Sequence, residues 1–217
     1  MEPIQDFNAE RVALCHALHD LGTARLSPGS TGNASVRVAG GMLISPTGQA
    51  CANATPDDLV FVDDSGNTPA GQLKPSSEWH MHNAIYRHYP DAGAIVHCHS
   101  RFATTLAALR KGIPAYHYMV AVAGGDSIEC ADYATFGTDT LATLVVEALR
   151  NRSACLMANH GQIAYAATPH AALDLAIQVE DLAAGYYQCL AIGEPQLLTD
   201  REMREVLEKF GSYGQQD

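Results

Sequence analysis

The stretch Ala94-Ile95-Val96-His97-Cys98-His99 joins a run of apolar residues to two histidines that are two positions apart. The apolar run predicts a short buried strand over 94–99. Successive side chains of a strand point to opposite faces, so His97 and His99 share one face and Cys98 takes the other. Two imidazoles placed in this way can converge on one ion. Two partly exposed histidines at a strand end would show the same spacing.

A third histidine favours the metal interpretation. His160 lies in Ala158-Asn159-His160-Gly161, where an apolar run ends in a glycine turn that can present a ligand. Three neutral imidazoles that leave one position for substrate are typical of a catalytic zinc site, and the same ligands accept manganese or cobalt. The sequence therefore predicts one Zn²⁺ ion per subunit, held by His97, His99 and His160.

Composition limits the class of protein. The chain has 217 residues, of which 47% are hydrophobic and 17% charged, and its formal net charge is −11. This length favours one globular domain over 1–217, and we expect the tail at about 211–217 to be flexible. The negative charge argues against nucleic-acid partners. No apolar stretch approaches the roughly 20 residues that span a bilayer, and no secretory signal is apparent, so we expect a cytoplasmic protein.

Periodicity and capping signals predict alternating strands and helices. We expect helices over 8–26, 75–89, 138–150, 169–192 and 199–211, with another after Ser100. We expect strands over 35–38, 42–44, 59–62, 94–99, 114–122 and 154–158. The predicted fold class is α/β, a single-domain sandwich with a central, mostly antiparallel β-sheet flanked by helices.

Three short segments rich in small donors indicate an anion site. They are Thr31-Gly32-Asn33-Ala34-Ser35, Ser45-Pro46-Thr47-Gly48 and Ser76-Ser77, the last at a predicted helix start. Glycines let main-chain N–H groups approach an anion, and a helix N-terminus favours negative charge. Each segment alone is an ordinary turn or cap. Together they would bind a phosphate without lysine or arginine, which suits the acidic composition.

Glu78 directly follows the two serines. A glutamate at this position is commonly a favourable partner of the helix dipole. The sharper interpretation is a carboxylate between phosphate and metal that moves a proton next to a metal-bound carbonyl. A second H-x-H pair, His80 and His82, falls within the same predicted helix, where residues two apart point to different faces. We interpret these two histidines as surface or helix-packing residues.

In sequence order, the motifs resemble the class II aldolases of the L-fuculose-phosphate aldolase type, within the aldolase and L-ribulose-5-phosphate 4-epimerase superfamily. The matching segments are TGNAS, SPTG, KPSSEWHMH, HCH, IPAYHYMVAVAGG, YATFGT, NHG and EKFGSYG. The resemblance covers nearly the whole chain. It implies an α/β sandwich subunit, a zinc ion, and a ring-like homotetramer with active sites at subunit interfaces.

The resemblance also implies roles for individual residues. His97, His99 and His160 match zinc ligands, and Glu78 matches the catalytic carboxylate, which can also touch the metal. The matched phosphate-binding positions are Asn33, Thr47, Gly48, Ser76 and Ser77. Tyr118 matches a catalytic tyrosine that acts on the aldehyde end of a neighbouring subunit's substrate, and Phe136 and Tyr213 match aromatic residues on that side.

The implied reaction is reversible cleavage of a ketose 1-phosphate, of the L-fuculose 1-phosphate type, to dihydroxyacetone phosphate and a short aldehyde such as L-lactaldehyde. Two departures from the family pattern concern the aldehyde half of the substrate. Asn159 stands where relatives often carry another histidine, and the chain ends only four residues after Tyr213.

Several alternatives share the architecture. Aldolases of 5-deoxyribulose or 5-methylthioribulose 1-phosphate belong to the same family. Methylthioribulose-1-phosphate dehydratases keep a glutamate and the histidines. L-Ribulose-5-phosphate 4-epimerases usually have aspartate where Glu78 stands. A Schiff-base aldolase would have to use Lys74 and would leave the three histidines without a role. The non-enzyme alternative is a zinc-stabilised or sugar-binding module without turnover, and Glu78 is the residue that distinguishes it from an enzyme.

Overall fold

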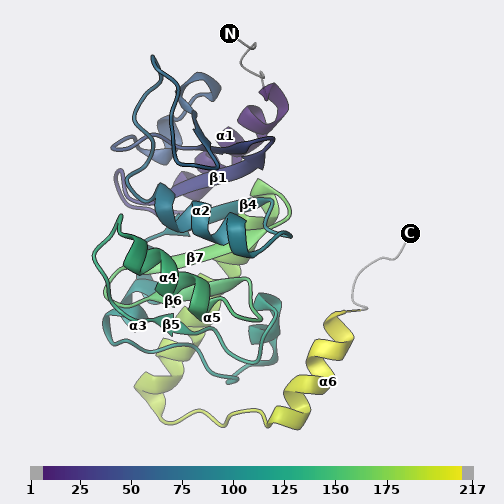
Figure 1. Cartoon of the computed structure of the whole chain (residues 1–217). Coiled ribbons are helices and arrows are strands. Elements are labelled where there is room, and N and C mark those ends of the chain that lie inside the picture. Colours follow the sequence, from purple (N-terminus) through teal and green to yellow (C-terminus); the bar gives the residue numbers. More distant parts are fainter. Residues whose placement is uncertain (1–6, 212–217) are drawn as a thin grey trace.

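The fold is built on one seven-stranded sheet, seen in a computed structural model that describes residues 7–211 (Figure 1). The strands are β1 Asn33–Val38, β2 Gly41–Ile44, β3 Val60–Asp63, β4 Ala94–Cys98, β5 Cys130–Ala131, β6 Ala154–Met157 and β7 Gly161–Ala166. Their order across the sheet is β3-β2-β1-β4-β7-β6-β5. All neighbouring pairs are antiparallel except β5 and β6. The prediction of a mostly antiparallel sheet is confirmed.

Helices cover both faces of the sheet (Figure 1). They are α1 Asn8–Thr23, α2 Trp79–His88, α3 Arg101–Ala108, α4 Asp139–Ala148, α5 Pro169–Ile192 and α6 Asp200–Phe210, with short 3₁₀ helices η1 Cys51–Asn53, η2 Pro56–Asp58 and η3 Tyr118–Ala123. One core lies between the sheet and α1, α3 and α5, and includes Leu18 and Leu106. The other lies under α2 and α4, and includes Ile85 and Val145. The domain is an α/β sandwich with two apolar layers.

Alternation along β4 assigns its residues to the two cores. Val96 and Cys98 belong to the core under α1, α3 and α5, whereas Ile95 belongs to the core under α2 and α4. His97 is two residues after Ile95 on the same strand, so its side chain faces the same, α2 side of the sheet. This placement directs the histidine toward the start of α2, where Glu78 is found.

Most element boundaries agree with the sequence, but the predicted strand over 114–122 is wrong. The part from Tyr118 to Ala123 is the 3₁₀ helix η3, and only an isolated bridge joins Ile113 to Ile128 nearby. The His117 side chain accepts a hydrogen bond from the Met119 N–H and caps η3. Local capping and burial of Val120 against the helix layer replace sheet pairing, which the apolar pattern alone could not distinguish.

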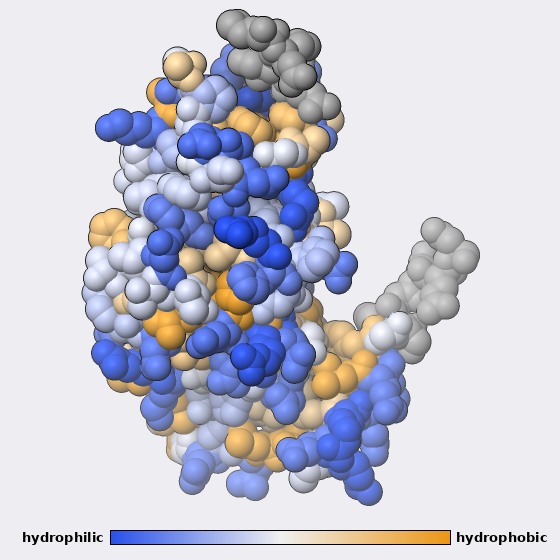
Figure 2. Space-filling view, in the orientation of Figure 1, coloured by the Kyte–Doolittle hydropathy of each residue, from blue (hydrophilic) through white to orange (hydrophobic). Residues whose placement is uncertain are grey.

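The C-terminal helices begin where the capping signals predict. Thr168 caps α5 through the Ala171 N–H, and Thr199 and Glu202 form a reciprocal capping box at α6. Helix α6 packs on η3 and extends away from the body (Figure 1). Hydrophilic residues dominate the face shown in Figure 2, with apolar surface near the base of α6. Within residues 7–211, no helix is long and apolar enough to cross a membrane.

Candidate metal centre and substrate cavity

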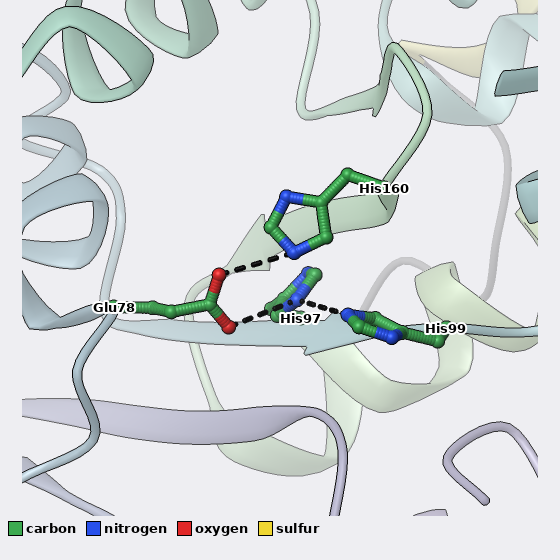
Figure 3. Close-up of side chains that lie close together, drawn as sticks. All are labelled: Glu78, His97, His99 and His160. Carbon is green, nitrogen blue, oxygen red and sulfur yellow. Dashed lines mark hydrogen bonds and ion pairs between the residues drawn. The ribbon is translucent and has the colours of Figure 1, made fainter. Parts of the chain in front are cut away.

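Four side chains from separate elements meet in one cluster, drawn in Figure 3. They are Glu78, His97, His99 and His160, and their potential ligand atoms all lie within 4.8 Å of one another. Glu78 is the N-cap residue of α2, His97 lies near the end of β4, and His99 follows that strand. His160 lies between β6 and β7. The predicted trio of histidines is therefore brought together, with a carboxylate added.

His97 is fixed in one tautomer by the sheet. Its Nδ1 lies 2.7 Å from the main-chain carbonyl oxygen of Gln162 on β7. A carbonyl only accepts, so Nδ1 carries a hydrogen, and Nε2 is the ring nitrogen that would bind a metal. This Nε2 lies 3.1 Å from Nε2 of His99. The second ring nitrogen of a metal-binding histidine is typically anchored in this way.

His160 is presented by a tight β6–β7 turn. Met157 pairs with Gly161, and Asn159 adopts a left-handed conformation with φ of 55°, which asparagine tolerates better than most residues. A side chain at position 161 would crowd the Cys98 carbonyl oxygen and the His99 ring, so glycine permits the close approach of the turn to β4. The turn places His160 Nε2 3.1 Å from Glu78 Oε1.

The Glu78 carboxylate is nearly buried and strongly held as an anion. Its Oε2 accepts a 2.9 Å hydrogen bond from the Asn33 side-chain amide and lies 3.2 Å from His97 Nε2. Burial alone would raise the pKa of this carboxyl, but the close positive charges of His97 and His160 outweigh it and hold the pKa far below its usual range. Glu78 therefore acts as an acceptor in this arrangement.

The donor set fits a divalent metal ion. Glu78 Oε1 is buried, and although it is close to His160 it makes no hydrogen bond of good geometry within the described part of the chain. Burial, with the charges of His97 and His160, lowers the pKa of His99 to about 4, so its ring is neutral at physiological pH. Three imidazole nitrogens and one carboxylate oxygen match the ligands of zinc, manganese or cobalt.

A cavity of about 340 Å³ opens beside the cluster. It is lined by Glu78, His99 and His160 and by all five predicted phosphate-binding residues, namely Asn33, Thr47, Gly48, Ser76 and Ser77. Helix α2 begins at Trp79 rather than at the predicted position 75, so the two serines precede the N-cap residue Glu78, whose side chain makes no capping hydrogen bond. Among residues 7–211, no lysine or arginine lines this cavity. A larger groove of about 660 Å³, between α2 and α4, is lined by other residues.

The aromatic residues expected on the aldehyde side fall into three groups. Phe136 lines the cavity and is 62% exposed. Tyr133, which the sequence did not single out, lines the same cavity. Tyr118 is 50% exposed at the start of η3 and does not line this cavity within one subunit. Tyr213 lies outside the described residues. Asn159, which departs from the family pattern, also lines the cavity.

The two histidines of the second H-x-H pair point to different sides of α2, and one of them is unexpectedly buried. His80 stacks on Trp79, with 3.9 Å between the ring centroids, in agreement with a packing role. His82 is completely buried and hydrogen-bonds Asn33 and Ser35, so a surface role is wrong for it. Residue spacing was the one sequence signal for this contact. Residues 78 and 82 are four apart and share a helix face, and Asn33 and Ser35 are two apart and share a strand face.

The fold and this cluster define a metal-binding α/β enzyme, and comparison with known proteins gives the family. Residues 12–187 match the family described as Class II Aldolase and Adducin N-terminal domain. The chain belongs to this family, and its relatives show it to be a class II aldolase, a lyase.

The relatives carry two kinds of name. A 5-methylthioribulose-1-phosphate/5-deoxyribulose-1-phosphate aldolase of Rhodospirillum rubrum is 49% identical over 208 residues, covering 94% of each chain. An L-fuculose phosphate aldolase of Escherichia coli is 49% identical over 190 residues, covering 87% of this chain and 88% of the relative. A solved L-fuculose 1-phosphate aldolase superposes with a TM-score of 0.90 at 38% identity, covering 94% of this chain and 96% of that one.

Proposed function

We propose that this aldolase cleaves a ketose 1-phosphate reversibly to dihydroxyacetone phosphate and a short aldehyde, with zinc as its metal. The observation that carries the proposal is the position of Glu78. Its carboxylate touches two of the three clustered histidines and lines the same cavity as Ser76 and Ser77. One carboxylate thus lies between a metal-ligand set and an anion-binding surface.

The cavity suits a phosphate monoester bound by neutral donors. Ser76, Ser77 and Thr47 offer hydroxyl groups, Asn33 offers an amide, and Gly48 has φ of 73° in a turn without a side chain. The serines also precede the N-terminus of α2, where the helix dipole favours an anion. In a protein with net charge −11, such local binding replaces attraction by the overall field.

In the proposed reaction, the bond between C3 and C4 of the ketose breaks. The C4 hydroxyl loses its proton as it becomes the aldehyde carbonyl, and C3 gains a proton to give dihydroxyacetone phosphate. His97, His99 and His160 would hold a divalent ion, which would supply Lewis-acid stabilisation of negative charge next to the carbonyl. Glu78 carries the proton to and from C3. Tyr118 of a neighbouring subunit handles the proton at the C4 hydroxyl.

The assignment of Tyr118 rests on a proposed homotetramer with active sites between subunits. Tyr118 and Phe136 are large, exposed aromatic side chains, as expected for residues that a second subunit covers. Helix α6 also extends away from the body of its own subunit (Figure 1). Phe136 and Tyr213 would then enclose the aldehyde. We further propose that the enzyme is cytoplasmic, as is typical of sugar-phosphate metabolism.

Two substrates have comparable support. L-Fuculose 1-phosphate is favoured by the names of the solved structure and of the Escherichia coli relative. 5-Deoxyribulose or 5-methylthioribulose 1-phosphate is favoured by the Rhodospirillum rubrum relative, which aligns over 94% of both chains. The substrates differ in the aldehyde half, where Asn159 and Phe136 line the cavity. The dehydratase and epimerase reactions remain comparison reactions for the test.

The test is a panel of phosphorylated ketoses incubated with the zinc-loaded protein. We expect release of dihydroxyacetone phosphate from at least one ketose 1-phosphate, measured by coupled reduction of that product. Metal-stripped protein is expected to be inactive and to recover on adding zinc. Loss of water or inversion at C4 without carbon–carbon cleavage would contradict the proposal.

A further inference from the structure

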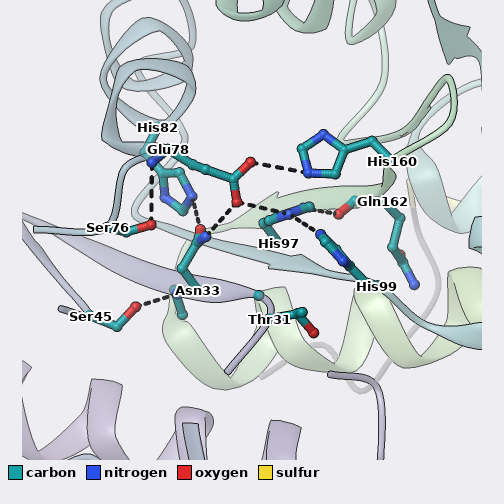
Figure 4. A network of polar contacts seen from close by, with 12 residues as sticks. Thr31, Asn33, Ser45, Ser76, Glu78, His82, His97, His99, His160 and Gln162 are labelled. Carbon is teal, nitrogen blue, oxygen red and sulfur yellow. Dashed lines mark hydrogen bonds and ion pairs between the residues drawn. The ribbon is translucent and has the colours of Figure 1, made fainter. Parts of the chain in front are cut away.

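A row of buried polar groups runs from the core under α2 to the metal-ligand cluster, most of it drawn in Figure 4. Tyr86 and His82, on α2, flank the Ser35 hydroxyl of β1 at 2.8 Å and 2.7 Å. His82 Nε2 lies 2.7 Å from Asn33 Oδ1, and Asn33 Nδ2 donates to Glu78 Oε2 at 2.9 Å. His82, Tyr86, Ser35 and Asn33 are buried, so water does not compete for these contacts.

The chemistry of the groups allows one arrangement of hydrogens. Glu78 is ionised and can only accept, so Asn33 presents Nδ2 to it and Oδ1 to His82. A carbonyl oxygen also only accepts, so His82 carries its hydrogen on Nε2. Its Nδ1 is then an acceptor for the Ser35 hydroxyl, whose oxygen accepts from the Tyr86 phenol. All four hydrogen bonds therefore point in the same direction, toward the carboxylate.

His82 is suited to hold this order because it stays neutral. Its ring is fully buried, and this burial, together with the charge of His97, lowers its pKa to about 3. A neutral ring has one donor and one acceptor, which match Asn33 Oδ1 and Ser35 Oγ. A protonated ring would have two donors. The alternating donors and acceptors also strengthen one another in a low-dielectric interior.

The fixed amide matters for the cavity as well as for Glu78. Asn33 Nδ2 has two hydrogens, and one of them makes no hydrogen bond to any residue between 7 and 211. Asn33 lines the cavity with Ser76 and Ser77, so the second hydrogen is available to a ligand there. If the amide turned over, its carbonyl oxygen would face both the Glu78 carboxylate and a bound anion.

We propose that His82 is a positioning residue of the active site, which holds the Asn33 amide with its N–H₂ group toward Glu78 and toward the phosphate of the substrate. The identity of the ligand as a phosphate monoester rests on the proposed function. The role of His82 is to exclude the flipped amide, which would place two acceptors against each other at Glu78 and repel the substrate.

Two substitutions of His82 separate its two contacts. His82→Gln places an amide nitrogen near the former Nε2 and keeps the donor to Asn33, whereas His82→Asn places its amide near the former Nδ1 and keeps only the contact with Ser35. We expect His82→Asn to weaken binding of dihydroxyacetone phosphate and of inorganic phosphate to the zinc-loaded protein by about 10-fold or more. The same variant should lower kcat/KM by about 10- to 100-fold. His82→Gln should lie much closer to the wild type in both respects.

Tyr89→Phe is the matched control, because it removes a hydrogen bond to Val146 at the end of the same helix without touching the row. Melting temperatures of the three variants measure general destabilisation. If phosphate binding fell in proportion to melting temperature in all of them, or equally in His82→Gln and His82→Asn, the positioning role would be overturned.

A second measurement determines the tautomer of His82 in the wild-type protein, and uses a variant only to assign the signals. In ¹⁵N-histidine-labelled wild-type protein, the ring signals that His82→Gln removes identify His82, and we expect the Nε2–H tautomer. An Nδ1–H tautomer would overturn the proposal. Failure of the wild type to cleave any ketose phosphate would count against the proposed function alone, because the tautomer and inorganic phosphate binding are read without turnover. Absence of phosphate binding by the wild type would overturn the part played by the cavity-facing hydrogen.

Discussion

Asn33 and His97 lie directly opposite each other on the antiparallel strands β1 and β4. Opposite residues of such a pair project from the same face of the sheet, and both side chains reach Glu78, through the Asn33 amide and the His97 imidazole. A shift of one residue in this register would turn one of the two side chains to the opposite face. The sheet register therefore fixes the position of the Glu78 carboxylate relative to His97.

Replacing Glu78 by glutamine tests proton transfer. The amide has nearly the shape of the carboxylate but cannot carry the proton, so we expect kcat to fall by about 10²- to 10⁴-fold. The three histidines remain, so zinc content and inorganic phosphate binding should largely persist. Steady-state kinetics, metal analysis and calorimetry measure the three quantities.

The control is Glu147→Gln on the exposed surface of α4, which removes the same charge away from the cavity and should leave kcat unchanged. A Glu78→Gln protein that turns over at the wild-type rate would remove Glu78 from the proposed mechanism. Loss of zinc from that variant would instead assign Glu78 mainly to metal binding.

His99→Ala tests the metal centre through stability. A ligand that binds only the folded state stabilises it by about 2.7 kcal/mol when its concentration is 100 times Kd. We expect zinc to raise the melting temperature of metal-stripped wild-type protein, and to raise that of His99→Ala much less. His170→Ala, on the surface of α5, is the control and should respond like the wild type. An equal response of His99→Ala would show that zinc binds elsewhere.

The approach of His97, His99 and His160 to one another could be predicted from the sequence because their geometry is mostly local. His97 and His99 converge through the two-residue period of one strand, and a glycine turn after an apolar run presents His160. The sheet type followed from short strands and glycine-closed turns. The strand predicted over 114–122 failed because apolar alternation there reflects packing of η3 against a helix, which has no local sequence signal.

The burial and the hydrogen-bond partners of His82 could not be predicted from local patterns. The histidine is buried only because α2 packs across β1, and its partners Asn33 and Ser35 are nearly 50 residues away in sequence. A histidine on an amphipathic helix usually has no function beyond packing or solvation. Non-local pairing decides such a role, whereas the spacing of Glu78 and His82 indicates only that they share a face.

Ser77→Ala tests the phosphate site. Loss of a hydroxyl that binds a charged group costs about 1.5–3 kcal/mol, so we expect KM for the phosphorylated ketose to rise by about 10-fold or more, with a smaller change in kcat. The serine lines the cavity but is not in the metal cluster. Ser65→Ala, which lies in the separate groove between α2 and α4, is the control. A change in kcat without a change in KM would contradict a binding role.

The buried neutral His82 predicts a loss of stability in acid. Its pKa is about 3 in the folded protein and 6.5 as the reference for the unfolded chain, so the unfolded state binds more protons between these values. Stability from this group is therefore complete above pH 6.5 and declines as pH falls, by about 1.4 kcal/mol per pH unit. Between pH 7 and pH 5 the wild type should lose about 2 kcal/mol more than His82→Gln. Urea unfolding of both metal-free proteins measures the difference, and parallel pH curves would contradict it.

Tyr118→Phe tests the aldehyde side and the sharing of sites between subunits. Tyr118 is exposed and does not line the cavity of its own subunit, so a catalytic role requires a neighbour. We expect the variant to slow cleavage of the full ketose more than proton exchange at C3 of dihydroxyacetone phosphate, because only cleavage uses the C4 hydroxyl. Refolding Tyr118→Phe together with Glu78→Gln should restore activity in about a quarter of the sites, since each intact site then combines residues of two different subunits. Absence of recovery in verified mixed oligomers, with each parent inactive alone, would place Tyr118 outside the shared site.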